Sequence, residues 1–359
     1  MYIRSPPHLL SLEAEGALKI GVLTGGGDCP GLNAVIQAIV TRASQYGFEV
    51  WGIEDGYKGL LEGRARPLRK EDVRDIYAIG GTILGTSRKN PTKSEEDIRR
   101  VLENVEKLGL DGLITIGGDD TLGAARKLYE RGVPVVGVPK TIDNDLSATD
   151  YSIGFWTAVQ TIAEALERLH TTARSHKRVI VAEIMGRYAG WLALMGGLAG
   201  GAHIILIPEK PLDIDEVCRV IEEREKRGEP YTVIAVAEGV KIPATGELAV
   251  AAAERDEFGH VRLGGIAKFL EEEIKRRTGK QVRSTILGYI QRGGSPVAFD
   301  RILGIRLGFK AVDLVKERKF GYAVVLRGTE IIPVKLDEVV GQLRRVPEEL
   351  FEYTDVFRG

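Results

Sequence analysis

Short apolar runs alternate with longer amphipathic stretches along almost the whole chain. The apolar runs are rich in β-branched residues and predict strands at 19–24, 48–53, 112–116, 133–138, 178–183, 203–207, 232–237 and 285–287. The amphipathic stretches show the helical spacing of apolar positions and predict helices at 32–46, 94–108, 122–131, 155–171, 212–227 and 265–278. This alternation indicates an α/β fold in which helices cover both faces of mostly parallel sheets.

The order of strands and helices restarts near residue 150, so we expect two similar three-layer α/β/α lobes with a cleft between them. Residues 1–18 would form an N-terminal extension ahead of the first strand. We assign residues 19–150 and about 265–320 to the first lobe, and residues 151–264 and the C-terminal segment to the second. Residues 240–262 are the least regular stretch, which predicts a loop or hairpin insertion.

The composition narrows the class of protein. With 359 residues, of which 43% are hydrophobic, the chain is long enough for two well-filled cores. Its net charge of -1 argues against a protein that binds nucleic acid through general basicity. No stretch approaches the roughly 18 apolar residues of a membrane span, and residues 1–18 lack the apolar core of a secretory signal. Two cysteines give no disulfide framework and five histidines show no zinc spacing, so we expect a cytoplasmic protein.

A glycine-rich turn, Gly25 to Gly31, follows the first predicted strand and leads into a helix. Glycines let a backbone approach an anion closely, and the start of a helix offers unpaired N–H groups. The turn matches neither the dinucleotide fingerprint nor a Walker loop. It therefore indicates either a phosphate-binding loop or only a tight turn, in which Cys29 fills a small space.

Two acidic turns, Gly117 to Thr121 and Pro139 to Asp145, each follow an apolar run of the buried parallel type. The carboxyl edge of such a sheet is where α/β proteins bind ligands. Asp119 is well placed to reach a hydrated Mg²⁺ held by substrate phosphates. The simpler alternative is that these polar residues only cap helices and close turns.

Asp143 and Asp145 stand two positions apart in the second turn, and Asn144 between them is expected to face away. One carboxylate can then take a proton from a hydroxyl while the other orients it or assists the metal. Arg88 and Arg187 lie in glycine-containing turns, and Arg283 and Arg292 flank another glycine-containing stretch, 287–294. Arginines in such turns often bind phosphate bidentately, although a lone arginine is usually a solvated surface residue.

In combination and order, four motifs make the chain resemble the 6-phosphofructokinase family from Lys19 to about residue 325. They are GGDCPGLN at 26–33, TIDND at 141–145, MGR at 185–187 and IQRGG at 290–294. The resemblance implies Mg²⁺-dependent transfer of a phosphoryl group to the 1-hydroxyl of fructose 6-phosphate. It places the donor in the first lobe and the sugar phosphate in the second.

The resemblance also implies residue roles at the reacting groups. Asp143 would be the general base, Asp145 would support it, and Asp119 would hold the metal. The donor phosphates would meet a separate set of residues: Gly26, Gly27, Arg88 and Lys140. Arg187, with Arg88, would neutralise charge on the transferred group.

The residues that the resemblance assigns to the sugar phosphate are Thr141, Ile142, Asp143, Met185, Gly186, Arg187, Glu238, Tyr289, Ile290, Gln291 and Arg292. Many relatives carry histidine where this chain has Tyr289, which can still donate one hydrogen bond. Arg178 and Arg283 match arginines that reach the 6-phosphate from a neighbouring subunit. A shared site of this kind requires a homo-oligomer, either a dimer or a tetramer.

Asp120 and Lys140 indicate which donor is used. ATP-using relatives carry glycine at both positions, which leaves room for the nucleotide's α-phosphate. Asp120 instead fills that space with a negative charge, and Lys140 adds a cation suited to inorganic pyrophosphate. The pair matches the pyrophosphate-dependent branch, whose reaction is reversible and serves glycolysis and gluconeogenesis. The alternative is an ATP-dependent enzyme in which Asp120 and Lys140 form a salt bridge.

Other readings rest on fewer residues. NAD and lipid kinases have turns similar to GGDDT at 117–121, but the motifs at 141–145 and 290–294 argue against them. A sensor built on an inactive kinase would be expected to lose Asp119 or Asp143, and both are present. Bacterial ATP-using relatives carry effector-binding arginines where this chain has Gln37, Thr41 and His170, so we expect a non-allosteric enzyme.

Overall fold

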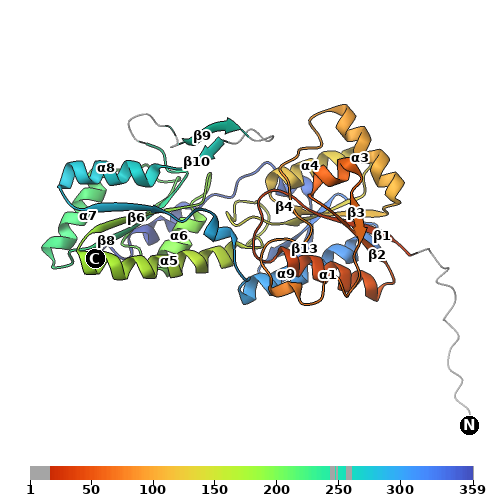
Figure 1. Ribbon diagram of the computed structural model, residues 1–359, viewed down its shortest axis with the longest axis horizontal. Helices are drawn as coiled ribbons and strands as arrows, with labels where there is room; N and C mark the ends of the chain where they lie inside the picture. Colours follow the sequence, from red (N-terminus) through yellow and green to blue (C-terminus); the bar gives the residue numbers. More distant parts are fainter. Residues whose placement is uncertain (1–16, 243–246, 248–249, 256–260, 359) are drawn as a thin grey trace, which may run out of the picture.

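Two lobes lie side by side along the long axis of the molecule in a computed structural model (Figure 1). The structure describes residues 17–242, 247, 250–255 and 261–358. None of the helices in this described part is long and apolar enough to cross a membrane.

The first lobe is built on a seven-stranded sheet in the order β13-β12-β5-β4-β1-β2-β3. Its parallel strands are β1 (Lys19–Thr24), β2 (Glu49–Ile53), β4 (Gly112–Gly117), β5 (Val135–Pro139) and β12 (Tyr322–Arg327). The two edges are antiparallel additions, β3 (Ala65–Pro67) and β13 (Glu330–Lys335). The five parallel strands end at one edge, which therefore collects the turns that follow them.

The second lobe is built on a four-stranded parallel sheet in the order β11-β6-β8-β7. The bounds are β6 (Val179–Ile184), β7 (Ile204–Leu206), β8 (Thr232–Ala237) and β11 (Val282–Ile286). A separate antiparallel pair, β9 (Val250–Arg255) and β10 (Val261–Leu263), confirms a hairpin in the described part of the 240–262 insertion. Positions 243–246, 248–249 and 256–260 of that insertion, and 1–16 of the N-terminal extension, lie outside the described residues.

Helices cover both sheets. Those of the first lobe are α1 (Leu32–Gln45), α2 (Tyr57–Glu62), α3 (Glu95–Leu108), α4 (Asp119–Glu130), α9 (Ala298–Lys316) and α10 (Leu336–Val339). Those of the second are α5 (Phe155–His176), α6 (Trp191–Ala199), α7 (Ile214–Lys226) and α8 (Ile266–Thr278). Short 3-10 turns are η1 (Ile76–Ala78), η2 (Gly288–Arg292) and η3 (Glu348–Asp355). In the first lobe, α1 and α9 lie on one side of the sheet and α3 and α4 on the other (Figure 1).

All eight predicted strands and all six predicted helices are present, and the largest shift is at the end of α5, which runs to His176 and not to the predicted residue 171. Two long helices were not predicted. α6 is apolar on nearly every side, so it has no polar face to reveal its period. α9 contains Gly304 and Gly308, where an added Cβ would approach α1 atoms to 3.1 and 2.8 Å. The close crossing of α9 over α1 needs glycines, and glycines weaken the helical signal.

The sheets divide the chain differently from the expected boundaries. α8 and β11 belong to the second lobe, because β11 pairs with β6. α9, β12 and β13 belong to the first lobe, because β12 pairs with β5. Assigning residues 265–320 wholly to the first lobe was therefore wrong for 266–286, and the C-terminal segment serves both lobes. Sequence periodicity finds strands but does not reveal which neighbour each strand joins.

The buried carboxylate of Asp300 forms hydrogen bonds between the two lobes. Asp300, in the first turn of α9, accepts hydrogen bonds from Gly154 N (3.0 Å), Thr157 N (2.8 Å) and Thr157 Oγ1 (2.6 Å). These donors belong to the N-terminal end of α5, whose first N–H groups need acceptors. Burial raises the pKa of Asp300, and the three hydrogen bonds oppose that rise.

Candidate active site

A pocket of about 220 Å³ lies where the carboxyl ends of strands from both sheets face each other. Turns after β1, β4 and β5 form its first-lobe side, and turns after β6 and β8 form its second-lobe side. The predicted site residues that line it are Gly26, Gly27, Arg88, Asp119, Asp120, Lys140, Thr141, Ile142, Asp143, Asp145, Met185, Arg187, Glu238 and Arg292. Sequence segments more than 250 residues apart thus meet in one cavity.

The glycine-rich turn contributes its backbone to the pocket. Gly26 has φ +77 and donates its N–H to Ser87 O (3.1 Å), while Thr86 Oγ1 donates to Gly26 O (2.7 Å). A Cβ at Gly27 would lie 2.7 Å from Nη1 of Arg292. Glycine therefore lets a guanidinium from the second lobe approach the turn directly.

The second acidic turn is held so that its two aspartates face the pocket. Thr141 Oγ1 accepts a hydrogen bond from Asp143 N (3.1 Å), and Ser152 Oγ donates to Thr141 O (2.6 Å). Asn144 has φ +52 and is buried, and its Oδ1 accepts from Ser152 N (3.1 Å). The Asn144 side chain therefore points away from the pocket, as predicted, which leaves Asp143 and Asp145 on the pocket side.

Lys140 joins the glycine-rich turn to the acidic turn. Its N–H donates to Gly117 O (2.9 Å), which extends the pairing of β4 with β5. Its ammonium Nζ donates to Gly27 O, and the side chain is only 3% exposed. Burial lowers the pKa of Lys140, while the nearby carboxylates of Asp28 and Asp143 raise it. The lysine thus places its buried amino group at the junction of two pocket walls.

The pocket carboxylates titrate unusually because they are buried close together. Burial, and then the charge of Asp143, raises the pKa of Asp145 to about 7. The same two causes raise the pKa of Glu238 to about 7. Burial also raises the pKa of Asp143, but Arg292, Arg187 and then Lys140 oppose that rise. Cations thus oppose the protonation of Asp143, whereas the charge of Asp143 adds to the raised pKa of Asp145, so the pair offers a candidate base and a partner.

Asp119 and Asp120 form the first turn of α4. Asp119 is exposed, and its Oδ1 accepts a hydrogen bond from Gly341 N (2.8 Å). The described part of the chain has no group of three or more His, Cys, Asp or Glu residues that could hold a metal alone. Asp119 is the exposed carboxylate at the start of α4, and one such carboxylate fits Mg²⁺ that arrives with substrate phosphates and keeps several waters.

A buried glutamine connects the second-lobe turns of the site. Gln291 Oε1 accepts from Met185 N (3.2 Å), and Gln291 Nε2 donates to Gly288 O (3.0 Å). Gly186, with φ +131, has no room for a Cβ, which would lie 2.8 Å from Ala189 O. Gly186, Tyr289, Ile290 and Gln291 therefore flank the pocket without lining it.

Two predicted residues lie far from this pocket. Arg178 directly precedes β6, and Arg283 is the second residue of β11, so both lie near the amino ends of their strands. The pocket lies at the carboxyl ends. A strand advances about 3.3 Å per residue, which separates Arg178 from Met185 by roughly 20 Å. Neither arginine can serve the site of its own chain.

Five pocket residues lie outside the set of predicted site residues: Asp28, Gly118, Thr121, Tyr188 and Leu343. Asp28, Gly118 and Tyr188 are direct neighbours of residues that were predicted, so inspection of the adjacent positions could have found them. Leu343 carries no signal, because only the tertiary path of the C-terminal segment brings this residue to the pocket. It is 44% exposed.

Comparisons with known proteins agree with this geometry. The family described as Phosphofructokinase matches residues 19–315. The chain is 52% identical to the pyrophosphate–fructose 6-phosphate 1-phosphotransferase of Streptomyces coelicolor, covering 95% of this chain and 100% of that one. It is 48% identical to the ATP-dependent 6-phosphofructokinase of Mycobacterium tuberculosis, with the same coverage.

A solved structure is also similar. The T-state phosphofructokinase of Pichia pastoris superposes with a TM-score of 0.80 at 32% identity, covering 94% of this chain and 37% of that longer one. Fold, pocket and comparisons together define an α/β phosphotransferase. The chain belongs to the phosphofructokinase family.

Proposed function

We propose that this phosphofructokinase uses inorganic pyrophosphate to phosphorylate the 1-hydroxyl of fructose 6-phosphate, reversibly and with Mg²⁺. The observation that carries the proposal is the buried Lys140, whose ammonium lies beside the glycine-rich turn and Asp143. The relatives' names support both donors, since 52% identity goes with pyrophosphate and 48% with ATP. The proposal of pyrophosphate as the donor therefore rests on the pocket residues.

Lys140 and Asp120 act on the donor in opposite ways. A buried ammonium is a compact charge that would attract the dense charge of pyrophosphate. Asp120 lines the same pocket at the start of α4. By the family resemblance, its carboxylate would occupy the space that a nucleotide needs for its α-phosphate. Together they favour a donor without a nucleoside.

In the proposed mechanism, Asp143 accepts the proton of the sugar 1-hydroxyl as that oxygen attacks one phosphorus of pyrophosphate. The bond from that phosphorus to the bridging oxygen breaks, and inorganic phosphate leaves as fructose 1,6-bisphosphate forms. Asp145 would hold the hydroxyl in position, because burial and the charge of Asp143 both disfavour a second negative charge there. Arg187, Arg88 and Lys140 surround the phosphoryl group and stabilise its spread charge. Asp119 would hold Mg²⁺, which when bound would neutralise the donor phosphates.

The sugar phosphate would lie toward the second lobe. Glu238 and Arg292 line that side of the pocket and can bind the sugar hydroxyls and phosphate. Tyr289 is 64% exposed at the pocket rim, with the Arg292 guanidinium 5.7 Å from its ring centre. Its hydroxyl could donate the hydrogen bond that histidine supplies in relatives.

A homo-oligomer would complete the site. Arg178 and Arg283 are too far from their own pocket, so they would reach the 6-phosphate bound by a second copy. Large apolar side chains beside Arg283 are exposed, namely Ile286 (60%), Tyr289 (64%) and Ile290 (57%). Exposed apolar residues next to charged ones are typical of protein interfaces. We propose a cytoplasmic dimer or tetramer that serves glycolysis and gluconeogenesis.

Initial rates with pyrophosphate or ATP as the sole donor test the proposal. We expect pyrophosphate to give the higher kcat/KM. Lys140→Met should lower kcat/KM for pyrophosphate about 100-fold, because it removes one preorganised charge. Lys127→Met, an exposed lysine on α4, is the control. A higher kcat/KM with ATP would show that the proposed donor is wrong.

Two substitutions at Asp120 show whether the size or the charge of this side chain excludes ATP. Asp120→Gly removes both, and Asp120→Asn removes only the charge. If repulsion excludes ATP, both variants should gain about tenfold in kcat/KM for ATP. If bulk excludes it, only the glycine variant should gain. No gain in either variant would contradict the role given to Asp120.

A further inference from the structure

The C-terminal strap, residues 340–346, runs between the lobes along one side of the pocket. It begins after α10, whose Leu336 and Val339 are buried against Leu122 and Leu146 of the first lobe. It ends before η3, which packs against β7 and α6 of the second lobe. The strap is therefore anchored in both cores.

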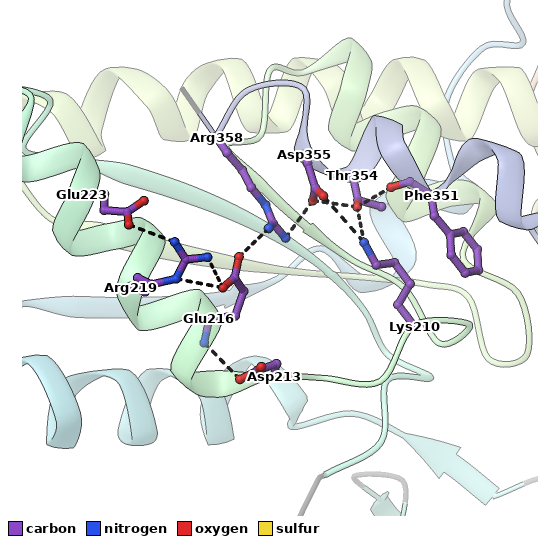
Figure 2. A network of polar contacts seen from close by, with 9 residues as sticks. All are labelled: Lys210, Asp213, Glu216, Arg219, Glu223, Phe351, Thr354, Asp355 and Arg358. Carbon is purple, nitrogen blue, oxygen red and sulfur yellow. Dashed lines mark hydrogen bonds and ion pairs between the residues drawn. The ribbon is translucent and has the colours of Figure 1, made fainter.

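Figure 2 shows how the chain beyond the strap is fastened to the second lobe. Arg358 forms ion pairs with Glu216 of α7 (3.0 Å) and with Asp355 (2.8 Å). Lys210 Nζ donates to Thr354 Oγ1 (2.9 Å) and lies 3.9 Å from Asp355. These contacts hold the far end of the strap in a fixed position.

Between its anchors, the strap contacts both acidic turns of the site. Gly341 N donates to Oδ1 of Asp119 (2.8 Å), and Arg344 N donates to the backbone carbonyl of Asp145 (2.8 Å). Leu343 forms an antiparallel bridge with Leu146 and lines the pocket. The same short segment thus touches the candidate metal ligand and the candidate catalytic turn.

Arg344 locks the strap in place with its side chain. Its Nη1 donates to Asp150 O (2.6 Å), and its guanidinium lies 4.6 Å from the ring centre of Trp191. In return, Trp191 Nε1 donates to Arg344 O (2.9 Å). Two residues further on, Val346 N donates to Glu209 Oε1 (2.9 Å). These contacts fix both the path and the rotation of the strap.

We propose that Gly341 and Arg344 are positioning residues for metal binding: Gly341 orients the Asp119 carboxylate and Arg344 holds the strap that carries Gly341. This rests on the proposed function in one respect, that Asp119 binds the metal. A hydrogen bond to one carboxylate oxygen fixes the orientation of the carboxylate group and so the position of its other oxygen. Losing such a partner typically weakens metal binding about 10- to 100-fold.

Gly341 allows a clean perturbation. Its φ is +76, a left-handed conformation that alanine disfavours and asparagine tolerates better. A Cβ at Gly341 would meet no atom within 4 Å, so a substitution changes the backbone preference without a clash. Gly109, at the end of α3, has φ +65 and equally open space, which makes Gly109→Ala the matched control away from the pocket.

The test is a calorimetric titration of pyrophosphate into the full-length protein with and without Mg²⁺. The Kd without Mg²⁺ divided by the Kd with Mg²⁺ gives the factor by which the metal strengthens pyrophosphate binding. We expect Gly341→Ala to reduce that ratio at least tenfold, Gly341→Asn to restore most of it, and Gly109→Ala to leave it unchanged. Equal ratios in Gly341→Ala and Gly109→Ala would overturn the proposal.

Two further variants separate positioning from folding. Arg344→Ala should reduce the ratio as Gly341→Ala does, while Arg345→Ala, an exposed neighbour with the same charge, should not. In an Asp119→Ala background, Gly341→Ala should cause no further loss. An additional loss there would show that the strap acts through another group and would overturn the proposal.

The same titrations show whether the role of the strap or the proposed donor is wrong. If Mg²⁺ strengthens the binding of ATP and not of pyrophosphate to the wild type, the donor is wrong. The same Kd ratios measured with ATP then decide the role of the strap. If Mg²⁺ strengthens neither ligand, the strap does not position a metal ligand and the inference fails.

Discussion

Asp145→Asn should stabilise the ligand-free protein while impairing it as an enzyme. The folded protein raises the pKa of this carboxyl from 3.8 to about 7, so it binds the proton more tightly than the unfolded chain does. The resulting stabilisation is fully present below about pH 4 and is lost as the pH rises through 7. Asparagine has no charge to ionise, so the variant escapes that loss.

The size of the effect follows from the shift. A rise of roughly three pKa units at about 1.4 kcal/mol per unit corresponds to roughly 4 kcal/mol by pH 8, of which about 1.5 kcal/mol is already lost at pH 5. The advantage of Asp145→Asn over the wild type should therefore grow by about 2–3 kcal/mol between pH 5 and pH 8. The backbone bond from Arg344 N to Asp145 O is unaffected by the substitution.

Urea unfolding of both proteins at pH 5 and pH 8, without substrate or metal, measures this difference. Asp215→Asn, at an exposed aspartate, is the control and should show no such growth. Steady-state rates on the same samples should show a loss in kcat of about 100-fold, the usual contribution of a positioned acid–base group. A stability difference that does not change with pH would refute the assignment of the raised pKa to Asp145.

Three further predictions concern other parts of the molecule. Arg292→Leu removes the cation that most strongly opposes the raised pKa of Asp143, so the acid limb of the kcat/KM–pH profile should shift to higher pH by about one unit. Equimolar refolded mixtures of the nearly inactive Arg178→Ala and Asp143→Asn proteins should regain activity at roughly a quarter of the sites, whereas separate sites would regain none. Asp300→Ala should lower the free energy of unfolding by about 3 kcal/mol in urea, because it leaves buried α5 donors unpaired; a loss under 1 kcal/mol would contradict this role.

Much of the pocket could be predicted from sequence because its residues follow strands. Lys140 directly follows β5, Asp143 lies in the turn after it, and Asp119 lies in the turn after β4, so local pattern alone brings them to one sheet edge. Arg178 and Arg283 are different. Nothing in the local pattern separates them from surface arginines, and their role came only from the family resemblance.

The features that could not be predicted depend on long-range pairing. Leu343 reaches the pocket because β12 and β13 return the chain to the first sheet before the strap crosses to the second lobe. The crossing of α9 over α1 depends on close backbone contact at Gly304 and Gly308. The pattern of apolar positions does not show where two helices come this close. The expected lobe boundaries failed for the same reason, since pairing partners were inferred from chain order.

The division of the first sheet between the two ends of the chain has a consequence for how the protein is made. Strands β1 to β5 leave the ribosome early, but β12, which pairs with the free edge of β5, is made only after all four strands of the second sheet. The second lobe can therefore complete its sheet first. Until Tyr322–Arg327 emerges, the nascent chain exposes an unpaired edge of β5, and this edge is where a chaperone or a neighbouring nascent chain would bind.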